Sequence, residues 1–180
     1  DGFARCCPNE SRERGCFPLS RLSGLNMRPY CLFRVVSVEW MAPIASLDPR
    51  PGGEVSWTHQ NGDTVSGQFV ELVPDRRVVF TYGWERTDVG VPPGSTVVEI
   101  DLRPTPTGTE LRLVHRGLEG PMADAHTGGW ANYLTRLATR AAGVDPGPDP
   151  LAAGRVPARA ELGMASARQS SQDLEELPDE

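Results

Sequence analysis

Five side chains in this 180-residue sequence could contact a ligand: one histidine and four aromatic residues. His115 alternates with Leu111 and Leu113 in a segment of period two, which places its imidazole on an apolar strand face. There it could exchange a hydrogen bond with a ligand, or it could be a core histidine bonded to a neighbouring protein group. Both interpretations remain open at this point.

The four aromatic residues suggest the same two alternatives. Phe80, Tyr82 and Trp84 follow one another at every second position, and Trp130 lies in a later segment with helical spacing. Such side chains either fill a core or line a cavity, and the polar atoms of tyrosine and tryptophan need partners when buried. We therefore take His115, Trp84, Tyr82, Phe80 and Trp130 as the candidate ligand-binding residues.

The other two histidines are expected at the surface. His126 comes just before a glycine pair at the predicted start of the firm helix, where an exposed position is favoured over the mouth of a cavity. His59 flanks the Asn61-Gly62 turn and is expected to face solvent. The three histidines lack metal-ligand spacing, so we expect no metal site.

Catalytic motifs are missing from the sequence. It contains no nucleophile elbow, phosphate-binding loop, dinucleotide fingerprint or HExxH motif. Glu99 and Asp101 alternate with apolar residues and are expected to point to solvent, so they do not suggest a carboxylate pair. We expect no catalytic residue and no cofactor, and a binding protein is favoured over an enzyme.

The periodicity predicts the elements that would position these side chains. Alternating segments predict strands, Asn61-Gly62 predicts a hairpin, and a helical apolar stripe with Gly143 as its C-cap follows the last strand. The stretch 41–53 is interpreted as a loop, and 32–38 as an edge strand or the end of a helix. The predicted strands are 54–59, 64–72, 77–86, 95–103 and 109–116, and the predicted helix is 123–142, firm from Trp130 onward.

These elements predict an α+β fold. Strands joined by short turns form an antiparallel sheet in sequence order, and the C-terminal helix covers its apolar face. A curved sheet leaves room for a cavity beneath the helix. We expect the domain to span 39–150, preceded by an irregular atypical segment, 1–38, and followed by a disordered acidic tail, 151–180.

Composition narrows the classes of partner. The net charge is −6 and the arginines are scattered, so neither a nucleic acid nor an anionic membrane surface is an expected partner. The sequence has no run of 18 apolar residues and no apolar signal core, and we expect a cytoplasmic protein. All four cysteines lie within the first 31 residues without a CxxC pair, which favours free thiols over a metal site or a disulfide.

Seven consecutive pieces of the sequence resemble one known family. The stretch from Trp40 to Pro150 resembles the SRPBCC superfamily, also called START or Bet v 1-like, and in particular its bacterial activator of heat-shock protein 90 ATPase homologue-like members. The matching pieces are EWMAP at 39–43, LDPRPGGE at 47–54, GQFVELVPDRRVVFTYGWE at 67–85, VPPGSTVVEIDL at 91–102, GTELRLVHRGL at 108–118, HTGGWANYLTRLA at 126–138 and GVDPGPDP at 143–150.

The resemblance implies a helix-grip fold: a curved antiparallel sheet packed on a long C-terminal helix. Family members begin with a strand and two short helices, and residues 1–38 do not resemble that segment. It also implies three candidate functions. The first is binding of a small hydrophobic or aromatic molecule between sheet and helix. The alternatives are a co-chaperone-like or regulatory module that binds a chaperone or regulatory protein, and a cyclase- or hydrolase-like enzyme.

Overall fold

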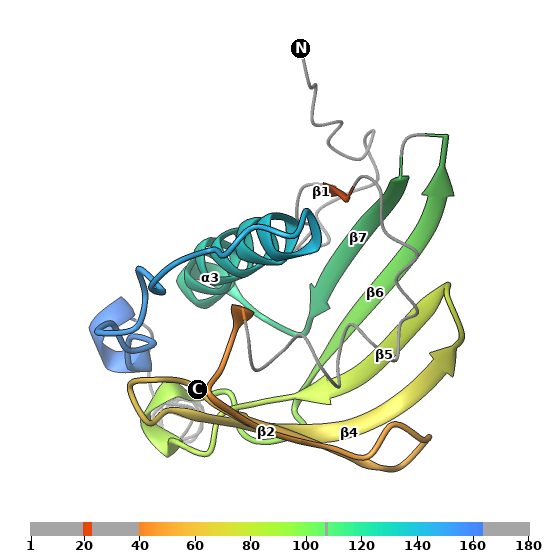
Figure 1. Ribbon diagram of the computed structural model, residues 1–180. Helices are drawn as coiled ribbons and strands as arrows, with labels where there is room; N and C mark the ends of the chain where they lie inside the picture. The colour runs from red at the N-terminus through yellow and green to blue at the C-terminus, as the bar shows by residue number, and fades with distance from the viewer. Residues whose placement is uncertain (1–19, 23–39, 107, 164–180) are drawn as a thin grey trace, which may run out of the picture.

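The structure, a computed structural model, describes residues 20–22, 40–106 and 108–163. Its main feature is a curved antiparallel sheet wrapped against one long helix, as the sequence predicts (Figure 1). The seven strands lie in the order β1-β7-β6-β5-β4-β3-β2. Their bounds are β1 Ser20–Leu22, β2 Ile44–Leu47, β3 Glu54–Thr58, β4 Thr64–Val73, β5 Arg77–Tyr82, β6 Thr96–Thr105 and β7 Gly108–Arg116.

The meander from β3 to β7 confirms the predicted topology, since each strand pairs antiparallel with the next. Two 3-10 turns, η1 Thr87–Val89 and η2 Arg159–Leu162, accompany the long α-helix α3, Gly120–Ala141. The β3–β4 turn forms at Asn61-Gly62, where Gly62 takes a φ of 87°. Of that pair, only Gly62 has a positive φ, the left-handed backbone conformation.

Close backbone approach and a bulge accompany the bend of the sheet. A Cβ atom on Gly67 of β4 would lie 1.8 Å from the carbonyl oxygen of Thr81, so only glycine fits there. Two residues further along β4, the register with β5 shifts between Phe69 and Glu71. A bulge of this kind increases local twist and bends the strand.

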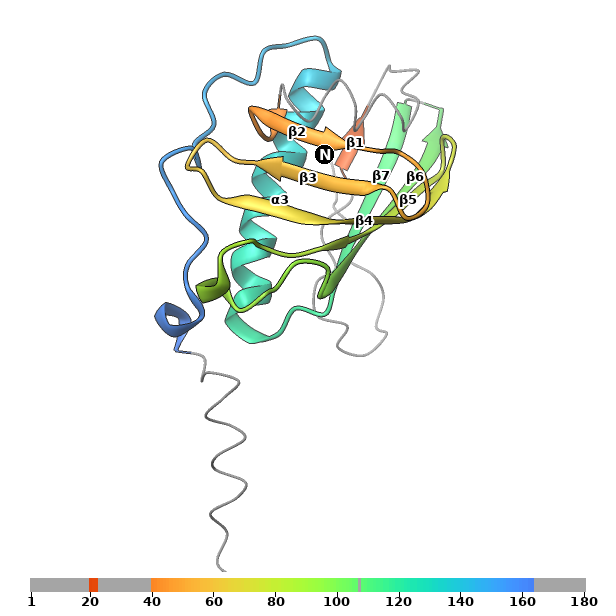
Figure 2. The same cartoon turned by 90° about the horizontal axis from the view of Figure 1, so that it is seen from below.

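The concave face of the sheet carries the core. Val78, Phe80 and Tyr82 of β5 are buried there together with the alternating apolar residues of β6 and β7, as predicted. Helix α3 lies across this face in both views (Figures 1 and 2). On the opposite face, Arg77 bonds Glu99 at 2.9 Å and Asp101 at 2.7 Å, so both carboxylates lie on the convex face, as expected, although they are ion-paired.

Three segments differ from the sequence interpretation. The stretch read as a loop contains β2, which pairs with β3 because Ile44–Leu47 is a short run able to extend the sheet edge. Within the N-terminal segment expected to be irregular, β1 pairs with β7. Helix α3 begins at Gly120, with proline in its first turn, and continues through Gly128-Gly129 because tertiary packing outweighs their low helix propensity.

A segment that we call the strap, residues 144–163, follows α3. It runs back alongside the helix toward the helix N-terminus in both views (Figures 1 and 2). Residues 151–163 were expected to belong to a disordered tail, yet they make specific hydrogen bonds to the β3–β4 turn and to Arg86. The remainder of the expected tail, 164–180, lies outside the described residues.

Several N-terminal expectations also fall outside the described residues: the four cysteines, the β-rich stretch 32–38, and all of 1–38 except β1. Within the described part of the chain, no helix has the length and apolar character needed to cross a membrane.

Candidate ligand-binding cavity

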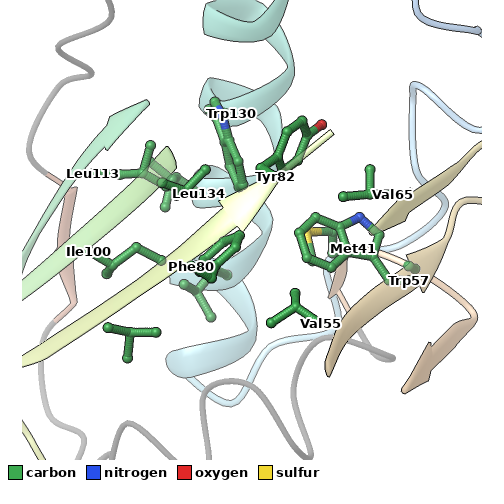
Figure 3. Packing of buried hydrophobic residues seen from close by; sticks show 14 of the residues in the cluster. Met41, Val55, Trp57, Val65, Phe80, Tyr82, Ile100, Leu113, Trp130 and Leu134 are labelled. Atoms are coloured by element: carbon green, nitrogen blue, oxygen red, sulfur yellow. The ribbon is translucent and has the colours of Figure 1, made fainter. Parts of the chain in front are cut away.

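A cavity of about 360 Å³ lies between the curved sheet, α3 and the strap. Its volume falls in the range of small-molecule sites, about 300–1,000 Å³. Aromatic side chains form much of its wall, and Figure 3 shows Tyr82 between Trp130 and Trp57. The aromatic and histidine residues lining it are Trp57, His59, Tyr82, Trp84, His126, Trp130 and Tyr133.

The strap side of the cavity holds a four-residue chain of hydrogen bonds. Trp57 Nε1 donates to His59 Nε2 at 3.0 Å, so the histidine proton lies on Nδ1, which bonds the Tyr133 hydroxyl at 3.0 Å. Tyr133 then donates to Asp149 Oδ2 at 3.2 Å. The rings of His59 and Tyr133 are stacked, with centroids 5.4 Å apart.

A second tryptophan–histidine pair joins the sheet to α3. Trp84 Nε1 donates to His126 Nε2 at 3.0 Å, and His126 Nδ1 donates to the carbonyl oxygen of Met122 at 2.9 Å. His126 is 5% exposed. Burial lowers its pKa, although the Met122 hydrogen bond opposes that effect.

The third pair lies deeper. Trp130 Nε1 donates to His115 Nδ1 at 3.1 Å, which leaves the proton on Nε2 to bond Thr96 Oγ1 at 2.8 Å. Thr96 in turn donates to the carbonyl oxygen of Tyr82 at 2.9 Å. His115 is completely buried, and this burial, helped by nearby His126, lowers its pKa to about 2.

All three histidines of the chain are therefore neutral acceptors of an indole N–H. His59 follows the same rule, because burial lowers its pKa despite the opposing charges of Asp149 and Asp63. A histidine whose acceptor nitrogen already holds a proton donor has no free lone pair to act as a base. The arrangement is thus suited to holding aromatic walls in place rather than to moving protons.

The strap is attached by side chains from three elements. Asn61 Nδ2 donates to the carbonyl oxygen of Gly154 at 2.5 Å, and Arg86 donates to that of Val156 at 3.2 Å. Arg86 also binds the buried carboxylate of Asp63 at 3.0 Å. On α3, buried Arg136 donates to the backbone carbonyls at the start of the strap, at Pro146, Gly147 and Pro148.

Two helical glycines keep one wall of the cavity open. Gly128 and Gly129 line the cavity, and a Cβ atom at either position would meet no atom within 4 Å. Each glycine costs an α-helix about 1 kcal/mol relative to alanine. Because neither glycine has a side chain, the space beside the helix stays empty in return for this loss of helix stability.

The structure brings three of the five candidate site residues to the cavity: Tyr82, Trp84 and Trp130. Phe80 and His115 are not among the lining residues and lie in the core behind them. His115 differs from the expectation of a cavity-facing imidazole because Trp130 and Thr96 occupy both of its nitrogens. It is a core histidine that fixes the orientation of a cavity wall.

Two expectations about histidines are wrong. His126 is buried rather than exposed, because α3 begins at Gly120 and so places His126 one turn before Trp130 on the same helix face. His59 is half-buried and lines the cavity, held by Trp57 and Tyr133. The spacing of Trp57 and His59, two residues apart on one strand face, was the available signal.

Tyr133 and Asp149 were not anticipated from the sequence. Tyr133 follows Trp130 by three residues and could have been placed on the same helix face by spacing. Asp149 lies in a proline-rich segment whose path no periodicity predicts. Among the described residues, no group of three or more histidine, cysteine, aspartate or glutamate side chains could hold a metal ion.

Comparisons with known proteins identify a family. The family model described as Activator of Hsp90 ATPase homolog 1-like protein matches residues 33–142. A solution NMR structure of an AHSA1-like protein from Rhizobium etli is 38% identical, with a TM-score of 0.53, and the match covers 73% of this chain and 84% of that one. A search of the curated proteins finds no match.

Two further crystal structures share the fold. CalU16 from Micromonospora echinospora is 24% identical, with a TM-score of 0.53 and coverage of 73% of this chain and 75% of that one. A protein from Chromobacterium violaceum is also 24% identical, with a TM-score of 0.52 and coverage of 68% and 93%. Together with the Rhizobium etli protein, they place the chain among helix-grip proteins.

Proposed function

This chain belongs to the family of activator of Hsp90 ATPase homolog 1-like proteins, an SRPBCC-type helix-grip family, and from that premise we propose that it binds a small apolar or aromatic molecule in its cavity. The main support for this proposal is the cavity of about 360 Å³, whose walls include tryptophan and tyrosine rings. Binding is favoured when an aromatic ring of a ligand displaces water from such walls, because apolar surface is then buried.

The internal pairing of the walls supports binding over catalysis. Trp57, Trp84 and Trp130 each hold their ring by a hydrogen bond to a neutral histidine. Their orientation is thereby fixed before a ligand arrives, and pre-organisation reduces the entropy that binding must overcome. The same bonds occupy the imidazole lone pairs that a hydrolase- or cyclase-like mechanism would use as a base.

The glycines of α3 allow a direct test. We expect the neutral fluorophore N-phenyl-1-naphthylamine to bind saturably, with one site per chain, in a fluorescence titration. Replacing Gly129 by leucine should weaken this binding at least tenfold, because the new side chain occupies the empty space beside the helix. Thermal stability should stay level or rise, since leucine is the better helix former.

Ala131→Leu is the matched control, because Ala131 is two residues away on α3 and exposed. This variant should bind the fluorophore as the unaltered protein does. Binding that is unchanged in Gly129→Leu, or lost equally in both variants, would contradict the proposed cavity site.

A further inference from the structure

The polar groups of the cavity wall are almost all committed to protein partners. The indole N–H groups of Trp57, Trp84 and Trp130 donate to histidines, and the Tyr133 hydroxyl donates to Asp149. At the rim, Asn61 Nδ2 bonds Asp63 and the strap, and Arg155 pairs with Glu161. A ligand would find few donors among the lining residues.

Within the buried part of the wall, the hydroxyl of Tyr82 is an exception. Tyr82 is 4% exposed, and within the described residues its hydroxyl has no hydrogen-bond partner. The one completely enclosed side-chain nitrogen or oxygen without a partner in that part of the chain is Trp40 Nε1. The Tyr82 hydroxyl is therefore not sealed in by protein, and because Tyr82 lines the cavity we place the hydroxyl toward it. Figure 3 shows this hydroxyl on the side of the ring that points away from Trp130.

The surroundings of this hydroxyl define what it can bind. The Tyr82 ring packs at 4.7 Å from the His115 ring and at 6.1 Å from the Trp130 ring, at the deeply buried side of the cavity. Burial raises the pKa of Tyr82 well above its ordinary value, so the group keeps its proton. A phenol hydroxyl in an apolar wall is suited to donate that proton to an oxygen atom of a ligand.

The charges around the cavity disfavour an anionic ligand. Asp149 lines the cavity and is buried, and its carboxylate accepts bonds from Asn132, Tyr133 and the backbone of Leu151. The one arginine that lines the cavity, Arg155, is exposed at the rim and paired with Glu161. A carboxylate entering the cavity would lose its hydration without gaining a cation in return.

Resting on the proposed binding function, we infer that the ligand is an uncharged aromatic carbonyl compound whose carbonyl oxygen accepts a hydrogen bond from the Tyr82 hydroxyl. The ring system of the ligand then lies against Trp57, Trp84 and Trp130, and its polar end points toward β5. The Tyr82 hydroxyl would thus orient the ligand in a cavity whose walls are otherwise apolar.

The test uses two rigid probes that differ in one group: fluorene, and 9-fluorenone, which carries a carbonyl on the same rings. Both are measured by displacement of N-phenyl-1-naphthylamine. The unaltered protein should bind fluorenone about fivefold to tenfold more tightly, the gain of one neutral hydrogen bond. Fluorene-9-carboxylate should bind more weakly than fluorene, because of the desolvation cost.

Tyr82→Phe removes only the hydroxyl. It should bind both uncharged probes as the unaltered protein binds fluorene, and it should melt at or above the same temperature, because no protein hydrogen bond is lost. Tyr133→Phe is the contrast, since it removes a hydroxyl bonded to His59 and Asp149, and it should melt lower. Equal affinities of the unaltered protein for fluorenone and fluorene would overturn the inference. Tighter binding of fluorenone than of fluorene by Tyr82→Phe would overturn it as well.

The infrared carbonyl band of bound fluorenone gives a readout that needs no variant. A hydrogen bond from Tyr82 shifts the band to lower frequency than in an apolar solvent, and an unshifted band contradicts the assignment. Failure of fluorene and of N-phenyl-1-naphthylamine to bind would refute the binding function itself. Loss of the carbonyl preference alone would refute only the role of Tyr82.

Discussion

In each histidine of this chain, the unprotonated ring nitrogen accepts a hydrogen bond from a tryptophan. The pairs are Trp57 with His59, Trp84 with His126 and Trp130 with His115. Protonation of any of these rings would place an N–H group against another N–H group and break the bond. The cavity walls are thus held by neutral imidazoles, which ties the stability of the fold to pH.

The sign of this dependence follows from the lowered pKa of the two buried rings. In the unfolded chain His115 and His126 titrate near pH 6.5, whereas in the folded protein burial lowers the pKa of both, that of His115 to about 2. Below pH 6.5 the unfolded chain therefore binds more protons, and the free energy of unfolding should fall as the pH falls. We expect a loss of about 2 kcal/mol from His115 between pH 7 and pH 5, and a further loss from His126 in the same direction.

Urea unfolding at a series of pH values checks this expectation. His115→Gln serves as the matched variant, because an amide can accept from Trp130 and donate to Thr96 without titrating. The free energy of unfolding of this variant should fall less steeply between pH 7 and pH 5, because the proton that His115 takes up on unfolding no longer contributes. Parallel pH profiles for the two proteins would show that His115 does not carry the effect.

Residue identities could be chosen from the sequence, but their partners could not. Period two correctly placed Phe80, Tyr82 and Trp84 on one inner face because strand geometry is local. The pairing of His115 with Trp130 joins β7 to α3 through tertiary packing, which no spacing encodes. His126 was wrongly expected at the surface, because the low helix propensity of the glycine pair predicted a firm helix only from Trp130 onward.

Among the elements, the strap forms one side of the cavity, and we expect its opening to expose the interior. It contributes lining residues from Asp149 to Pro157, and single bonds from Asn61 and Arg86 hold its middle portion. The backbone there makes short turns but does not pair with the sheet. Such a segment opens locally at a lower free-energy cost than a central strand.

Trypsin offers a measure of that opening, since Arg155 and Arg159 lie in the strap. We expect Asn61→Ala to speed cleavage at these arginines, because the variant loses the bond to Gly154. Bound N-phenyl-1-naphthylamine should slow cleavage in both proteins, as the ligand stabilises the closed strap. Cleavage is followed by mass spectrometry of timed digests.

Thr135→Ala is the control for this experiment, since Thr135 is exposed on α3 and bonds only its own helix backbone. It should be cut at the rate of the unaltered protein. Equal rates in all three proteins would mean that Asn61 does not restrain the strap.

The sequence predicted the regular elements better than the strap, for a physical reason. Strands β3 to β7 and helix α3 follow from periodicity and turn residues. The strap has neither period, and DPGPDP indicates only that helix and central strand are excluded. Its place is set instead by side chains from other elements, Arg136 above all, whose guanidinium binds three strap carbonyls and that of Trp40.

At the scale of the whole molecule, we propose that the functional end of the domain lies beyond residue 150, because strap residues up to Pro157 line the cavity. We expect a chain ending at residue 163 to melt and to bind N-phenyl-1-naphthylamine as the full chain does. A chain ending at residue 150 should bind at least tenfold more weakly and melt lower, because it lacks part of the cavity wall and the Arg86 and Asn61 contacts.

Calorimetry and probe titration on the two truncated proteins make the comparison. If the domain instead ended at residue 150, as expected from the sequence, the chains ending at residues 150 and 163 would melt and bind the probe alike. Weakened binding after the cut at 163 would assign a role to residues 164–180.

The tryptophan–histidine pairs also bear on how this sequence can change through evolution. Replacing one histidine alone by an apolar residue strands a buried indole N–H, at a cost of about 1–3 kcal/mol. Replacing the tryptophan at the same time removes the donor together with its acceptor. The six positions therefore form three units of co-substitution, each linking residues that the chain separates by 2, 42 or 15 places. An apolar replacement of a paired histidine is therefore expected together with replacement of its tryptophan, and each such exchange would alter one cavity wall at a time.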